Sequence, residues 1–121
     1  MRVLGIVILL IFLIGAFASG SEPIPYDTQR LCNAIFKAEG GHKAQYLYGI
    51  RSVHYSGVLE ARRICINTIN NNKRRFEGQD KYTDYLEFLA SRYCPIGCDN
   101  DRGTNKYWVK NVRYFYEREG L

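Results

Sequence analysis

The chain has 121 residues, a length that suits one compact domain. Its formal net charge of +5 suits a partner that is an anionic polymer or surface. It carries no internal repeat and no low-complexity tract, which excludes repeat arrays and compositionally biased proteins. It also lacks a phosphate-binding loop, a nucleophile elbow and a zinc-protease motif, so the enzyme classes that depend on them are excluded.

Residues 1–18 have the pattern of a secretory signal peptide. Arg2 is the only charge before the apolar run Val3–Ala18, which closes on the A-x-A cleavage site Ala16-Phe17-Ala18. The run is shorter than the roughly 20 apolar residues of a spanning helix, which favours cleavage over an uncleaved anchor. We therefore predict a signal peptide at 1–18, one domain at 19–121, and an exported protein that is periplasmic or secreted.

All four cysteines, Cys32, Cys65, Cys94 and Cys98, lie in the exported part. An even number in a small exported domain predicts two disulfides rather than free thiols. We prefer Cys65 with Cys94, because both lie on inner faces of helices expected to pack, and this leaves Cys32 with Cys98. No spacing of cysteine and histidine indicates zinc, so we predict neither a metal nor a cofactor.

The first part of the domain predicts a helix followed by irregular chain. The helix spans Thr28–Glu39, with Asp27 as its N-cap and Gly40-Gly41 as a stop signal. The segment Tyr46–Gly57 mixes aromatic, β-branched and polar residues with glycine. It predicts an irregular stretch that could include a short strand or hairpin.

Three further helices are predicted in the rest of the chain. The second spans Val58–Phe76, and the asparagines at 70–72 are expected to fray it locally. The third begins near Asp84 and stops near Pro95, and the fourth spans Asn105–Glu119. This order of elements predicts a mostly α (α+β) domain.

Glu39 is the candidate catalytic residue. It shares one side of its helix with Cys32, Ile35 and Phe36, at the edge of the apolar face. Burial there and the negative end of the helix dipole would both raise the pKa of the carboxyl, as a general acid at neutral pH requires. The alternative is an exposed carboxyl at the helix end, and the spacing alone leaves both interpretations open.

Several segments resemble the active-site region of lytic transglycosylases and goose-type lysozymes. They are residues 34–41 (AIFKAEGG) and 48–52 (YGIRS), which match the catalytic helix and the strand segment beside the sugar cleft. Residues 88–93 (FLASRY) resemble the helix that bears the family's cleft tyrosine. Residues 61–69 (ARRICINTI) resemble a helix of small phage-type and bacterial members. The chain is thus similar to the lysozyme-like superfamily over nearly all of its exported part.

The resemblance implies a lysozyme-like helical domain that cleaves the β-1,4 bond between N-acetylmuramic acid and N-acetylglucosamine. Glu39 would be the general acid and base, and the substrate's N-acetyl group or 6-hydroxyl would complete the reaction, so one carboxyl suffices. The residues expected to line the sugar cleft are Tyr48, Gly49, Ile50, Ser52, Tyr55 and Tyr93. The three tyrosines could also stack on sugar rings.

The implied partner is the peptidoglycan glycan strand, bound by a monomer with no nucleic acid and no stable membrane anchoring after signal cleavage. Two alternatives belong to other classes of function. One is a non-catalytic exported module that binds wall glycan or a protein. The other is a secreted basic protein that acts on membranes. Two departures from the family pattern are Arg51-Ser52-Val53 in place of a Gln-rich signature, and Tyr93-Cys94-Pro95 at the end of the third helix.

Overall fold

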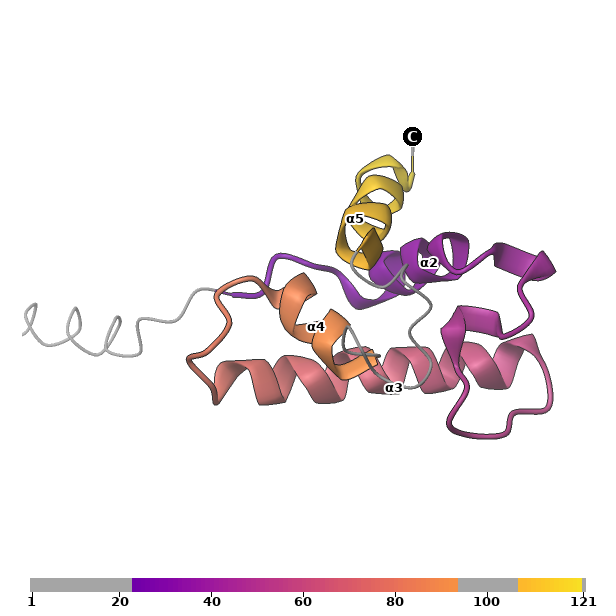
Figure 1. The fold of residues 1–121 in the computed structure, drawn as a ribbon, viewed down its shortest axis with the longest axis horizontal. Coiled ribbons are helices and arrows are strands. Elements are labelled where there is room, and N and C mark those ends of the chain that lie inside the picture. The colour runs from indigo at the N-terminus through magenta and orange to yellow at the C-terminus, as the bar shows by residue number, and fades with distance from the viewer. Residues whose placement is uncertain (1–22, 94–106, 121) are drawn as a thin grey trace, which may run out of the picture.

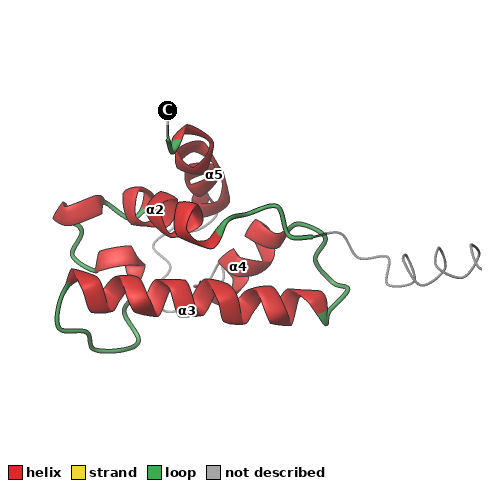
Figure 2. Ribbon diagram, turned by 180° about the vertical axis from the view of Figure 1, so that it is seen from behind, coloured by secondary structure: helices red, strands yellow, loops and turns green. Residues whose placement is uncertain are grey.

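The computed structural model describes residues 23–93 and 107–120, which fold into α-helices joined by turns. The elements are α2 (Thr28–Ala38), η1 (Gly41–Lys43), η2 (Leu47–Gly49), α3 (Val58–Glu77), α4 (Tyr85–Tyr93) and α5 (Trp108–Arg118). No β-strand occurs in these residues, so the mostly α class is confirmed. In opposite views α2 lies between the long helix α3 and α5, with α4 alongside α3 (Figures 1 and 2).

Several sequence predictions lie outside the described residues. These are the signal peptide at 1–18, Cys94 and Cys98, the helix stop near Pro95, and the predicted start of the last helix at Asn105. Among the helices of the described part, none is long and apolar enough to cross a membrane.

The first helix, α2, forms where the sequence predicts it. Asp27 is extended, and its Oδ2 accepts a hydrogen bond from the Arg30 N–H at 2.9 Å. The helix ends at Ala38 because Gly40 and Gly41 take positive φ angles of 111° and 62°, which glycine adopts without strain. Glu39 is therefore the C-cap residue of α2, where the chain leaves the helix.

The predicted fraying of α3 at residues 70–72 is wrong, because the helix continues without interruption to Glu77. Asn72 is 3% exposed, and its Nδ2 donates to the Thr68 carbonyl at 2.9 Å. A buried and satisfied asparagine does not compete with the helix as an exposed one would. Tertiary packing thus outweighs the low helix propensity of asparagine here.

The short strand or hairpin considered for Tyr46–Gly57 is also absent. Tyr48 and Gly49 have φ angles of 57° and 72°, and this left-handed turn prevents the extended backbone of a strand. The Tyr55 hydroxyl accepts a hydrogen bond from the Leu47 N–H at 2.8 Å and ties the two ends of the loop together. The segment is therefore a tethered loop around the turn η2.

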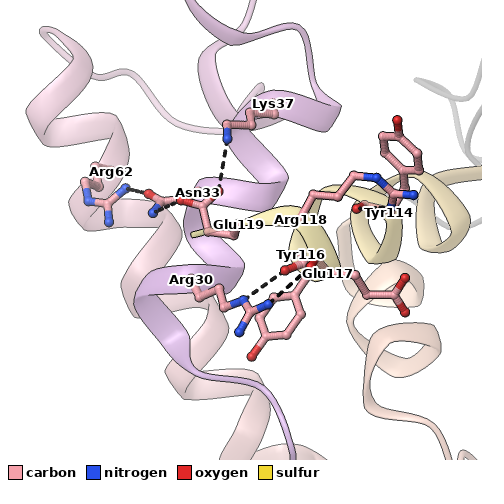
Figure 3. A network of polar contacts seen from close by, with 9 residues as sticks. All are labelled: Arg30, Asn33, Lys37, Arg62, Tyr114, Tyr116, Glu117, Arg118 and Glu119. Atoms are coloured by element: carbon pink, nitrogen blue, oxygen red, sulfur yellow. Dashed lines mark hydrogen bonds and ion pairs between the residues drawn. The ribbon is translucent and has the colours of Figure 1, made fainter. Parts of the chain in front are cut away.

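The C-terminal half of α5 is fixed on α2 by polar contacts (Figure 3). The Nε of Arg30 donates to the Tyr116 carbonyl at 2.8 Å, near the end of α5. The Glu119 carboxylate accepts from Asn33 at 2.8 Å and from Lys37 at 3.1 Å. The Tyr116 carbonyl also accepts a hydrogen bond from the backbone N–H of Glu119 at 3.2 Å, so the arginine adds a second donor to an oxygen at the helix end.

The core lies between the four helices. Its fully buried large side chains are Leu31, Ile35, Ile69, Leu86, Leu89, Val112, Cys32 and Cys65. Cys32 on α2 and Cys65 on α3 are buried, free thiols, and each influences the pKa of the other. Their predicted partners, Cys94 and Cys98, lie outside the described residues, so the pairings Cys65–Cys94 and Cys32–Cys98 stay predictions.

Candidate active site

The Glu39 carboxyl lies at the end of α2 and faces the start of α5. The side chain is half-buried, and its Oε2 accepts a hydrogen bond from the indole Nε1–H of Trp108 at 2.8 Å. Trp108 is itself 6% exposed, so this donor comes from a fixed, buried ring. In the structure the Glu39 carboxyl is therefore not the exposed group that the alternative interpretation describes.

The pKa of Glu39 is raised above the ordinary value for a glutamate. Burial is the largest cause, because it disfavours the charged form. The hydrogen bond from Trp108 and the positive charge of Arg51 both lower the pKa, but together they do not cancel burial. The pKa of this carboxyl is thus closer to that of a general acid at neutral pH than the pKa of a surface glutamate is.

Gly49 lies directly against this carboxyl. A Cβ at position 49 would stand 2.7 Å from the Cδ and Oε2 of Glu39 and 2.9 Å from its Oε1. These distances are nearly equal, so the backbone of Gly49 covers the flat face of the carboxyl group. Gly49, one of the predicted cleft residues, thus lies against Glu39.

Tyr93, at the end of α4, lies beside Trp108. The two ring centroids are 5.1 Å apart, and the Tyr93 hydroxyl is 3.4 Å from the Sγ of Cys65. Burial raises the pKa of Tyr93 well above its usual value, and the nearby Cys65 and Glu39 act in the same direction. The phenol therefore stays neutral, next to the residue that holds Glu39.

Arg51 adds a positive charge at the outer side of the site. Its guanidinium stacks over the ring of Tyr46 at 4.5 Å, which gives an exposed cation a defined position. The charge acts on Glu39. In the sequence, Arg51 is a departure from the family pattern, and it was not among the predicted site residues.

Tyr48 and Ile50 belong to the core rather than to a surface cleft. Tyr48 is 3% exposed, its ring centroid is 4.9 Å from that of Phe36, and its hydroxyl lies 3.4 Å from the guanidinium of Arg62. Ile50 is 8% exposed. Both side chains are buried beside the left-handed turn at η2, and their role as sugar contacts stays a prediction.

Ser52 and Tyr55, two further predicted cleft residues, differ in burial. Ser52 is exposed on the loop before α3. Tyr55 is half-buried, and its hydroxyl accepts a hydrogen bond from the Leu47 N–H; its sugar contact stays a prediction.

Trp108 is a residue of the site that the sequence did not predict. Its contact with Glu39 joins residues 69 positions apart, which no local pattern reveals. The available signal was that it is the single tryptophan of the chain, a ring whose N–H needs a partner when buried.

The comparisons with known proteins add no relative. No family model, no curated protein and no solved structure matches this chain. In residues 23–93 and 107–120 no group of three or more histidine, cysteine or acidic side chains is arranged to hold a metal ion.

A surface hollow of about 480 Å³ lies elsewhere, between α4 and α5. It contains none of the predicted site residues. Its lining is formed by Glu87, Val109, Lys110, Arg113, Tyr114, Glu117 and Arg118.

Proposed function

We propose that this protein is a peptidoglycan-cleaving glycosidase or lytic transglycosylase with a lysozyme-like fold, and that Glu39 is its general acid and base. One observation carries the proposal. A half-buried carboxyl with a raised pKa lies at the end of α2, accepts a hydrogen bond from the indole of Trp108, and has the backbone of Gly49 against it. Such a carboxyl is suited to hold a proton at neutral pH and to release it to a substrate.

The chemistry needs one carboxyl and the substrate's own groups. Glu39 donates its proton to the glycosidic oxygen as the bond from that oxygen to C1 of N-acetylmuramic acid breaks. The N-acetyl oxygen or the 6-hydroxyl of the same sugar supplies electrons to C1. The Glu39 carboxylate then takes a proton from the attacking 6-hydroxyl, which gives an anhydro end, or from water, which gives a reducing end.

The charge of the protein fits this substrate. The net charge is +5, and the guanidinium of Arg51 lies beside the site on the ring of Tyr46. Peptidoglycan carries carboxylates on its sugar and peptide parts, so a fixed cation near the acid would help to orient an anionic strand.

The test is digestion of purified peptidoglycan by the parent protein and by Glu39→Gln, with mass analysis of the products. Glutamine keeps the shape and still accepts from Trp108, but it has no proton to transfer. We expect the parent to release muropeptides and Glu39→Gln to release none. The matched control is Glu87→Gln, an exposed glutamate on α4, which should cleave like the parent.

Equal cleavage by Glu39→Gln and the parent would exclude the catalytic role of Glu39. A parent protein that sediments with peptidoglycan but never cleaves it would support the alternative of a non-catalytic glycan-binding module. The end groups of the products distinguish a transglycosylase from a hydrolase.

A further inference from the structure

The contact between Trp108 and Glu39 distinguishes the two oxygens of the carboxyl. The indole Nε1–H lies 2.8 Å from Oε2. An indole nitrogen can donate a hydrogen bond but cannot accept one, so Oε2 must be the acceptor whether Glu39 is charged or neutral.

We infer that Trp108 is the positioning residue of the acid: its N–H engages Oε2 and leaves the proton of neutral Glu39 on Oε1. A carboxylic acid has one carbonyl oxygen and one hydroxyl oxygen, and the carbonyl oxygen is the better acceptor. The bond from Trp108 therefore assigns the carbonyl to Oε2 and the hydroxyl to Oε1. The role of that proton in catalysis rests on the proposed function, whereas the contact itself does not.

The surroundings keep the carboxyl in this orientation. The backbone of Gly49 covers its flat face, and Trp108 binds it at one edge. Trp108 is in turn held by burial and by the Tyr93 ring, with centroids 5.1 Å apart. After the proton has been given up, the same N–H stabilises the carboxylate that must take a proton back.

The first experiment follows the indole N–H of the intact protein by nitrogen-15 NMR over a pH series. The chain has one tryptophan, so one indole signal is expected, and it needs no assignment. We expect its proton shift to titrate with one midpoint, above the ordinary range of a glutamate. In Glu39→Gln this titration should be lost. An indole signal that does not change with pH, or that titrates equally in Glu39→Gln, would overturn the inference.

The second experiment removes the donor with Trp108→Phe, which keeps a ring against Tyr93. We expect the pKa of Glu39, measured on its carbon-13-labelled carboxyl, to move further up and the pH optimum of cleavage to move with it. The control is Val112→Ala, which removes buried methyl groups from the same helix one turn on and should leave both quantities unchanged. A Glu39 pKa that stays constant in Trp108→Phe would contradict the inference.

These readouts separate the two proposals. Both NMR titrations are made without substrate, so they can succeed when no cleavage is found, and then only the proposed function fails. If Trp108→Phe does not fold, the titrations of the parent and Glu39→Gln decide the question alone.

Discussion

The backbone of Gly49 lies so close to the Glu39 carboxyl that no side chain fits between them. A Cβ on Gly49 would stand 2.7 Å from the Cδ of Glu39, a separation that real Cβ atoms essentially never show. The glycine also has a φ of +72°, which an L-residue adopts only with strain. Two separate requirements, backbone conformation and space, therefore fix glycine at this position.

Gly49→Ala should reduce both stability and cleavage. The left-handed backbone alone costs alanine about 1–2 kcal/mol, and the new methyl group must also displace the Glu39 carboxyl from Trp108. Gly41→Ala is the matched control, because Gly41 has a φ of +62° and its Cβ would meet an ordinary contact at 3.8 Å. Thermal unfolding and turnover are measured on both variants. If the two lose turnover equally, the close approach to Glu39 has no catalytic consequence.

The stability of Glu39→Gln relative to the parent should increase with pH. Burial raises the folded-state pKa of Glu39, so the folded protein loses stability as the pH rises from the unfolded-state pKa through the folded-state pKa. Because glutamine does not ionise, Glu39→Gln does not lose this stability as the pH rises. The difference in melting temperature between variant and parent is measured from about pH 4 to about pH 8.

For Glu60→Gln, the stability relative to the parent should change with pH in the opposite direction. Hydrogen bonds from the backbone and side chain of Ser56 lower the pKa of Glu60, so its carboxylate stabilises the folded protein above the unfolded-state pKa. Relative to the parent, Glu60→Gln should therefore become less stable as the pH rises. The same trend in both variants would show that the burial of Glu39 does not control the pH dependence.

Tyr93→Phe should lower turnover more than it lowers the melting temperature. The lost hydroxyl makes a weak contact with the Cys65 thiol at 3.4 Å, and the ring can still stack on Trp108. Tyr85→Phe is the matched comparison, because the buried Tyr85 hydroxyl donates to the Ile69 carbonyl at 2.8 Å. That variant should lose about 1–2 kcal/mol of stability and keep its turnover. A Tyr93→Phe variant with normal turnover and a lower melting temperature would remove Tyr93 from the site.

Cys32 and Cys65 should resist alkylation in the native protein and react once it unfolds. Both thiols are fully buried between α2 and α3, so a reagent in water cannot reach either sulfur. The measurement is mass labelling with iodoacetamide under native and denaturing conditions, followed by peptide mapping without reductant. A map that joins Cys65 to Cys94 would instead support the pairing that the sequence predicts.

The sequence determined the elements whose signals are local. The α2 helix begins after Asp27 and ends within one residue of its predicted end, because an N-cap carboxylate and a glycine pair act on their immediate neighbours. The spacing also placed Glu39 on the apolar side of that helix, where the structure finds it half-buried. Propensity was less reliable, since the asparagines of α3 are held in the helix by packing.

Only the tertiary structure decided what surrounds the Glu39 carboxyl. Trp108 reaches it from α5, which the polar contacts of Arg30 and Glu119 fix on α2. The burial of the Tyr48 ring beside a left-handed turn was likewise not visible in the sequence. Periodicity reports which face of a helix is apolar, but not which residue of another helix meets it. That choice depends on the relative placement of whole helices, which is set by packing over the entire core.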